Sequence, residues 1–117
     1  MDDKTKIEAV MNTYTDGTRS RDVALLKSIF HDDAVMTGWL GPDLLMGGPG
    51  PFYSALEANE VGADYTSEIT EISVEGPMAS AEVREKNLFG LDFVNRFHLI
   101  RQADESWIIV SKLFRHL

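Results

Sequence analysis

The last quarter of the chain constrains the fold most, because it has the pattern of a long antiparallel hairpin. Residues 93–101 alternate between apolar and polar side chains, and residues 107–114 form a second run rich in β-branched and aromatic residues. Residues 102–106, Gln-Ala-Asp-Glu-Ser, have the composition of a turn. Alternation with period two is typical of strands that bury one face. We therefore predict two paired strands that close a sheet.

Polar residues fall on the face of this hairpin that the alternation assigns to the core. Asn95 and Lys112 share that face with several apolar residues. These apolar residues are Phe97, Leu99, Val110 and Phe114. Buried polar groups are unfavourable unless they are paired. The pattern therefore predicts either a polar cluster within the core or the lining of a pocket.

Two more polar residues share this phase in the strand expected before the hairpin, residues 78–88. The apolar face of that strand is formed by Ala79, Ala81 and Val83, and Glu85 and Asn87 continue it. One hypothesis makes this surface a cavity floor, with Glu85 or Lys112 as an acid/base group and Asn95 as a hydrogen-bond donor. The alternative is a structural ion pair between Glu85 and Lys112, closed by Asn95.

The first half of the chain predicts three helices. Residues 4–16 carry apolar side chains at helical spacing, with Asp2 or Asp3 as the N-cap and Gly17 as the C-cap. A second helix runs from residue 21 to residue 30, and a third, short helix covers residues 52–59 after Pro51. Residues 34–39 read as a short strand between them. The apolar faces of the three helices are expected to pack on one face of a sheet.

The second half predicts strands joined by turns. Residues 65–75 form a strand with a bulge near residues 70–71, Gly76-Pro77 is a turn, and residues 78–88 follow. Helices followed by a mostly antiparallel, curved sheet indicate an α+β fold, with the helices on the concave side. We expect one domain over residues 1–117, with a conical cavity suited to a small molecule.

Composition excludes several classes of partner. The net charge of −8 argues against nucleic acid and against anionic membrane surfaces, and no run is long enough to span a bilayer. The polar start is unlike a signal peptide. The absence of cysteine excludes thiolate chemistry and favours a cytoplasmic location. No motif calls for a cofactor, and the contiguous His31-Asp32-Asp33 lacks the spacing of a metal site.

Two stretches then carry a resemblance to a known group. The chain resembles the NTF2-like superfamily (cystatin-like cone fold) at the end of the second expected helix, Ile29-Phe30-His31-Asp32-Asp33-Ala34, and in the late run Trp107 to Phe114. Tyr14, in the first expected helix, is part of the same resemblance. Within it, the chain is most similar to the small "putative lumazine-binding" proteins and to the SnoaL-like group. The resemblance covers nearly the whole chain. This fold hosts isomerases, dehydratases and binding domains.

Ketosteroid isomerase, a member of that superfamily, allows a comparison by position. It uses an aspartate base together with a tyrosine and a protonated aspartic acid as oxyanion donors. The resemblance puts Tyr14 at the place of the tyrosine, Asn95 at the second donor and Gly38 at the base. Because glycine cannot act as a base, the comparison implies an oxygen-binding pocket without the isomerase chemistry at these positions.

The remaining candidates concern the pocket wall and the opposite face of the sheet. The apolar wall or mouth of the pocket is expected to include Trp39, Phe52, Phe89 and Phe93, beside Tyr14 as a donor to a ligand. On the convex face, Ile109 and Leu113 would be exposed, which is unfavourable for a monomer. We therefore expect a homodimer through this face.

Three functions remain open from the sequence. The first is a domain that binds a small molecule of unassigned identity in the cone. The second is an enzyme of the SnoaL-like, dehydratase or isomerase type, acting by proton transfer through Glu85 or Lys112. The third is a dimeric structural module whose cone is filled by its own side chains. Whether the protein is an enzyme does not follow from the residues alone.

Overall fold

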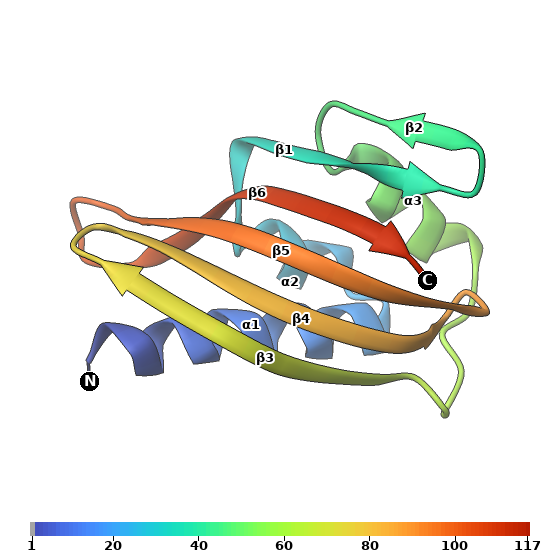
Figure 1. Ribbon diagram of the computed structural model, residues 1–117, viewed down its shortest axis with the longest axis horizontal. Coiled ribbons are helices and arrows are strands. Elements are labelled where there is room, and N and C mark those ends of the chain that lie inside the picture. Colours follow the sequence, from blue (N-terminus) through green and yellow to red (C-terminus); the bar gives the residue numbers. More distant parts are fainter. Residues whose placement is uncertain (1) are drawn as a thin grey trace.

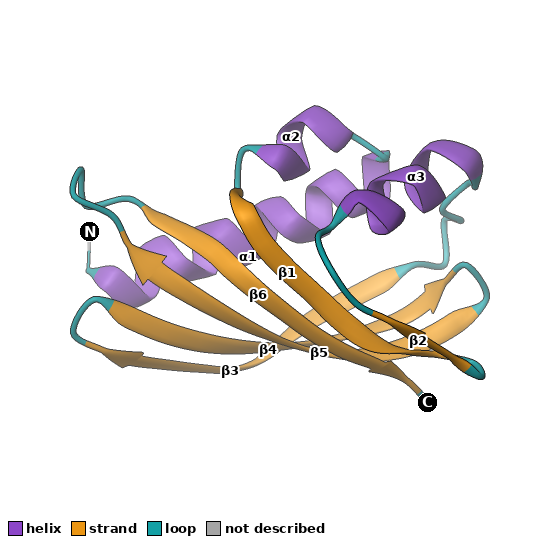
Figure 2. Ribbon diagram, turned by 90° about the horizontal axis from the view of Figure 1, so that it is seen from above, coloured by secondary structure: helices purple, strands orange, loops and turns teal. Residues whose placement is uncertain are grey.

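Three helices pack on one side of a six-stranded sheet in the computed structural model, which describes residues 2–117 (Figures 1 and 2). The helices are α1 (Asp3–Ser20), α2 (Val23–Lys27) and α3 (Gly50–Ala58). The strands are β1 (Phe30–Leu40), β2 (Asp43–Leu45), β3 (Thr66–Glu75), β4 (Met78–Leu88), β5 (Leu91–Arg101) and β6 (Trp107–His116). The predicted α+β class, with helices on one sheet face, is confirmed.

The terminal hairpin occupies the middle of the sheet. The strand order is β2-β1-β6-β5-β4-β3, and β5 and β6 pair in antiparallel as predicted. β6 also pairs with β1 in parallel, while the other neighbouring pairs are antiparallel. The prediction that the hairpin closes the sheet is therefore wrong. β1 comes from the first half of the chain and adds to the outer side of β6.

The helix α1 is longer than its sequence pattern predicts. Asp2 caps its start by accepting a hydrogen bond from the Thr5 amide at 2.8 Å, as expected. The helix continues through Gly17 and ends at Ser20, and Arg21 is its C-cap in a left-handed conformation. A Cβ atom at Gly17 would lie 2.8 Å from the Leu26 side chain. Gly17 therefore permits close packing of α1 against α2 and is not the C-cap.

The second helix is shorter than predicted, because the chain turns early into the sheet. α2 begins after Asp22, whose side chain accepts from the Leu25 amide at 3.0 Å, and it ends at Lys27. Phe30 already belongs to β1 and pairs with Ile109 of β6. The bulge predicted near residues 70–71 is confirmed by a register shift between Ile69 and Glu71.

The core lies between the helices and the concave face of the sheet (Figure 2). From α1 it receives Ile7, Met11 and Tyr14, all fully buried. Phe97 of β5 contacts the Tyr14 ring at a centroid separation of 4.9 Å.

Within residues 2–117, no helix is both long enough and apolar enough to cross a bilayer.

Candidate functional site

A buried carboxylate at Glu85 of β4 is the centre of the polar cluster. Its Oε1 accepts from the Tyr14 hydroxyl at 3.1 Å and from the Asn95 amide nitrogen at 2.7 Å, and its Oε2 accepts from the Tyr65 hydroxyl at 2.5 Å. The donors come from α1, from β5 and from the residue before β3. Because all three groups donate, the arrangement suits an ionised carboxylate, which only accepts. Three hydrogen bonds thus stabilise the buried Glu85 carboxylate in place of water.

Lys112 of β6 joins this cluster through Tyr14. Its Nζ donates to the Tyr14 hydroxyl oxygen at 2.9 Å. Among the ion pairs of residues 2–117, none connects Lys112 directly to Glu85. The direct ion pair between Glu85 and Lys112, which was one of the two alternatives from the sequence, is therefore absent within residues 2–117. A phenol hydroxyl separates the two charges and bonds to both.

Aromatic rings surround the Lys112 ammonium. Its Nζ lies 4.2 Å from the ring centroid of Phe52, 5.0 Å from that of Tyr14 and 5.5 Å from that of Phe114. These distances allow cation–π attraction, which partly offsets the loss of water. Burial nevertheless lowers the pKa of Lys112 from its ordinary 10.5 to about 8, and the negative charge of Glu85 opposes this shift.

The two tyrosines at Glu85 are held in their neutral, donating form. Burial raises the pKa of Tyr14 well above its ordinary value, and the neighbouring Glu85 charge raises it further. The same two causes raise the pKa of Tyr65. Both phenols therefore keep their protons at any physiological pH.

An apolar cavity with an empty volume of about 620 Å³, which includes open solvent at its mouth, lies between α3 and the sheet. Its wall is formed by Phe52 and Ala55 of α3, Met36 of β1, Leu88 of β4, the connecting residue Phe89, Phe93 of β5, and Lys112 and Phe114 of β6. Leu40, Leu45, Met46, Gly48 and Pro51 complete the lining. Lys112 is the charged residue of this otherwise apolar lining.

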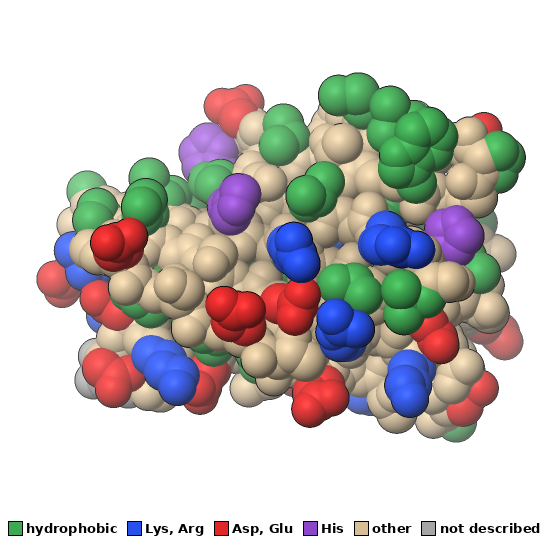
Figure 3. Space-filling model, in the orientation of Figure 1, with side chains coloured by type: hydrophobic (Ala, Val, Ile, Leu, Met, Phe, Trp, Pro, Cys, Tyr) green, Lys and Arg blue, Asp and Glu red, His purple; other side chains and the backbone are tan. Residues whose placement is uncertain are grey.

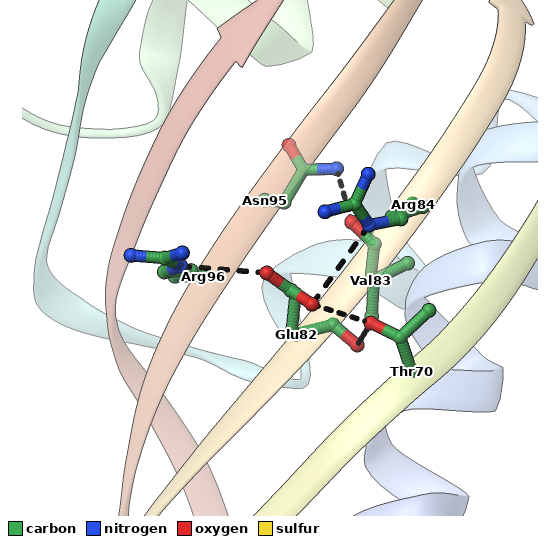
Figure 4. A network of polar contacts seen from close by, with 6 residues as sticks. All are labelled: Thr70, Glu82, Val83, Arg84, Asn95 and Arg96. Carbon is green, nitrogen blue, oxygen red and sulfur yellow. Dashed lines mark hydrogen bonds and ion pairs between the residues drawn. The ribbon is translucent and has the colours of Figure 1, made fainter.

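The rest of the polar cluster lies behind this wall. Tyr14, Glu85 and Asn95 are fully or almost fully buried and do not line the cavity. Asn95 also donates to the Val83 carbonyl oxygen at 3.2 Å, while its own Oδ1 has no partner within residues 2–117 (Figure 4). The structure thus brings together Tyr14, Glu85, Asn95 and Lys112. Their roles in binding or catalysis stay predictions.

Three residues expected at the pocket lie elsewhere. Trp39 is 54% exposed, because it shares the outward face of β1 with Val35 and Thr37. Asn87 is exposed, because a register shift after Glu85 and a positive φ of 61° turn its side chain to the Asp64 carbonyl oxygen. Val110 faces a shallow hollow on the convex side.

Val110 points to the convex face instead of the expected concave face because of the way β5 pairs with β6. Leu99 pairs with Ile109, whereas His98 pairs with Ser111, so Val110 is the extra residue of a bulge. The alternation reverses there, and Ile109 is fully buried. The expectation that Ile109 is exposed on the convex face is therefore wrong. Lys112 and Phe114, beyond the bulge, keep the predicted concave orientation.

Phe52, Phe97 and Phe114 take different places around the cavity. Phe52 and Phe114 line it, and Phe97 lies in the core beneath the Tyr14 ring. Phe89 and Phe93, which the sequence also suggested for the pocket wall, line the cavity. Sequence reasoning missed Tyr65, which bonds Glu85, because Tyr65 lies outside the regular strand.

The outer face of β4 carries a separate polar network (Figure 4). Glu82 accepts from Thr70 at 2.8 Å and lies 3.4 Å from Arg96 and 3.8 Å from Arg84. Glu82 and Glu85 therefore project to opposite faces of one strand, as the alternation predicts.

Gly38 of β1 lies where the resemblance puts a general base. A Cβ atom there would overlap the Phe114 carbonyl oxygen and lie 2.7 Å from two carbons of the Phe114 ring. The close approach of β1 to β6 thus leaves no space for an acidic side chain at this position.

Comparison with known proteins identifies one matching family and several similar structures. The model of a family described as "Putative lumazine-binding" matches residues 2–115. Comparison with curated proteins finds no match.

Three solved structures show how far the fold is shared. An NTF2-like protein of unknown function from Methylobacillus flagellatus KT is 28% identical with a TM-score of 0.91, covering 100% of this chain and 94% of that one. A similar protein from Shewanella baltica OS155 is 21% identical with a TM-score of 0.89, covering 97% and 93%. A ketosteroid isomerase-like protein from Erwinia carotovora atroseptica SCRI1043 is 19% identical with a TM-score of 0.74, covering 100% and 98%. The last two likenesses concern the fold alone.

Proposed function

This chain belongs to the NTF2-like superfamily and, within it, to the family described as "Putative lumazine-binding", and on that premise we propose that it binds a small, mainly apolar molecule in the cavity at Lys112. The observation that carries the proposal is the composition of the cavity wall. Apolar and aromatic side chains surround a single ammonium, which is the usual make-up of a small-molecule site with one orienting group.

The chemistry of the wall narrows the class of ligand. An ammonium has three donors, and Lys112 uses one of them on Tyr14 within residues 2–117. A ligand oxygen, from a carbonyl or a carboxylate, would accept from another. The rings of Phe52, Phe93 and Phe114 favour a flat, aromatic body. Lumazine, which the family description names, is a flat two-ring molecule with carbonyl groups and is the natural first probe.

Calorimetric titration tests this proposal. We expect lumazine or benzoate to bind the wild-type protein, and Lys112→Met to weaken binding by about tenfold or more, because a charge-assisted hydrogen bond is lost. Lys86→Met is the matched control, since Lys86 is an exposed lysine on β4. Affinity that is unchanged in Lys112→Met, or the binding of neither probe, would contradict the proposed site.

The proposal includes a symmetric dimer through the convex face of the sheet. Val35 and Trp39 of β1 and Leu113 of β6 are each about half exposed there, on adjacent strands. Figure 3 views this face, with hydrophobic side chains densest over β1 and β2 and charged side chains around them. Burying such residues against a second copy is favourable. Light scattering is expected to give a dimer mass that Leu113→Glu reduces to the monomer mass, and a wild-type monomer at micromolar concentration would exclude this assembly.

A further inference from the structure

Three groups form a continuous row of hydrogen bonds that begins at the cavity wall. Lys112 donates to Tyr14 at 2.9 Å, and Tyr14 donates to Glu85 at 3.1 Å. Only the first member of the row reaches the cavity, and the other two are sealed in the core. Lys112 is thus a charged residue in the lining of an apolar cavity, where an ammonium is poorly solvated.

We propose that Lys112 is a nucleophile that forms an imine with a small aromatic aldehyde bound in the cavity, with Tyr14 and Glu85 positioned to move the proton. The inference rests on the proposed function, because it assumes that the cavity admits a ligand carbonyl. It adds a covalent step and names the class of substrate.

The amine must lose a proton before it can attack, and the row of hydrogen bonds supplies the route. One proton shifts from Nζ to the Tyr14 oxygen while the Tyr14 proton shifts to Glu85 Oε1. This transfer transiently gives a neutral amine, a neutral phenol and a protonated Glu85, whereas the resting cluster keeps the ionised Glu85. The lowered pKa of Lys112, about 8, agrees with the geometry.

The covalent step then balances as a simple condensation. The Nζ lone pair forms a bond to the aldehyde carbon, and the carbonyl π bond breaks toward oxygen. The oxygen takes up a proton from the nitrogen to give a carbinolamine. A second proton, returned from Glu85 through Tyr14, lets the C–O bond break with release of water, and a C=N bond forms. The sum is one aldehyde and one ammonium group giving one protonated imine and one water, with Glu85 returned to its ionised form and no oxidant or reductant.

The surroundings of Lys112 restrict which groups set its pH dependence. Within residues 2–117, the titratable groups in the hydrogen-bonded row of Lys112 are Tyr14 from α1 and Glu85 from β4, with Tyr65 bonded to Glu85. α3 places the Phe52 ring against the ammonium, and the titratable Tyr53 of α3 packs beside Phe52. Because the relay moves the proton within the cluster, the wild-type reaction rate should be nearly level below about pH 8, where the cluster keeps that proton.

Reductive trapping tests the proposal directly. The protein is treated with benzaldehyde and cyanoborohydride, and intact mass spectrometry with peptide mapping locates the benzyl group. We expect saturable labelling of wild-type Lys112, faster than that of the exposed Lys27 and Lys86, and competition by benzoate. Lys112→Met should lose the fast label and Lys86→Met should keep it. Tyr14→Phe should slow labelling by about tenfold or more and shift its pH profile, because the proton route is cut.

The outcomes separate this inference from the proposed function. If benzoate binds but benzaldehyde labels Lys112 no faster than Lys86, imine formation is overturned and the binding site stands. If neither compound binds, both proposals fail. The comparison of lysines is made within the wild-type protein, so it does not depend on any variant folding.

Discussion

The buried ammonium of Lys112 and the phenol oxygen of Tyr14 meet at 2.9 Å, although 98 residues separate them in the chain. Because Tyr14 also donates to Glu85 at 3.1 Å, its hydroxyl bonds to a buried cation and to a buried anion at once. Such a shared partner strengthens both bonds in a medium of low dielectric. The cluster therefore depends on Tyr14 more than on any direct attraction between the two charges.

Tyr14→Phe is expected to lower the free energy of unfolding by about 2–3 kcal/mol, since two hydrogen bonds to charged groups are lost. Chemical denaturation measures the change. Tyr53→Phe is the control, because the Tyr53 ring packs on Phe30 and its hydroxyl makes no hydrogen bond within residues 2–117. The control should cost less than about 0.5 kcal/mol. Equal effects in the two variants would contradict the bridging role of Tyr14.

Lys112 should make stability rise with pH. Its folded pKa of about 8 lies below the ordinary 10.5, so between these values the unfolded chain binds more protons than the folded one. The cost of the buried ammonium is full below about pH 8 and is relieved as pH rises. The free energy of unfolding of wild type relative to Lys112→Met should therefore increase by about 2 kcal/mol from about pH 7 to about pH 9.5.

The upper limit of that window follows from the tyrosines. The pKa values of Tyr14 and Tyr65 are raised in the folded protein, so above about pH 10 the unfolded chain loses these protons first and stability falls. The comparison therefore stops below pH 10. A difference between wild type and Lys112→Met that stays flat with pH would mean that Lys112 is not destabilised by burial.

The sequence predicted the fold because local pattern and global burial agree in most elements. Alternation in β4 placed Val83 and Glu85 on the inner face and Glu82 and Arg84 on the outer face, as observed. The helical periodicity of α1 likewise placed Tyr14 toward the sheet. The same alternation brought Asn95 and Lys112 into one cluster with them.

The errors occur where one residue breaks the period. The bulge at Val110 reverses the faces of Ile109 and Val110, and the turn of the chain at Asn87 removes it from the concave face. Neither valine nor asparagine predicts a bulge, because the extra residue of a bulge is defined only by the register between two strands. The outward position of Trp39 similarly depends on the parallel pairing of β1 with β6, which local patterns do not encode.

Glu85→Gln is expected to lower the free energy of unfolding by about 3 kcal/mol. The Glu85 carboxylate accepts from three donors. The amide of glutamine would place its own NH2 donor against at least one of these donors, so the three hydrogen bonds cannot all form. Glu82→Gln is the control, because Glu82 makes its contacts with Thr70 and Arg96 on the outer face. It should cost less than about 1 kcal/mol. Thermal unfolding that ranks the two variants in the opposite order would argue against an ionised Glu85.

Gly38→Ala is expected to cost about 3 kcal/mol or more, because the added Cβ would overlap the Phe114 carbonyl oxygen and lie 2.7 Å from two ring carbons. To make room, β1 must move away from β6, and Phe114 must shift into the cavity that it lines. We therefore expect a lower melting temperature together with weaker binding of benzoate. Gly50→Ala at the start of α3 is the matched control, since a Cβ there meets nothing within 4 Å, and it should leave both properties unchanged. A stable Gly38→Ala protein with unchanged affinity would show that β1 tolerates a side chain here, and would reopen this position to a catalytic base.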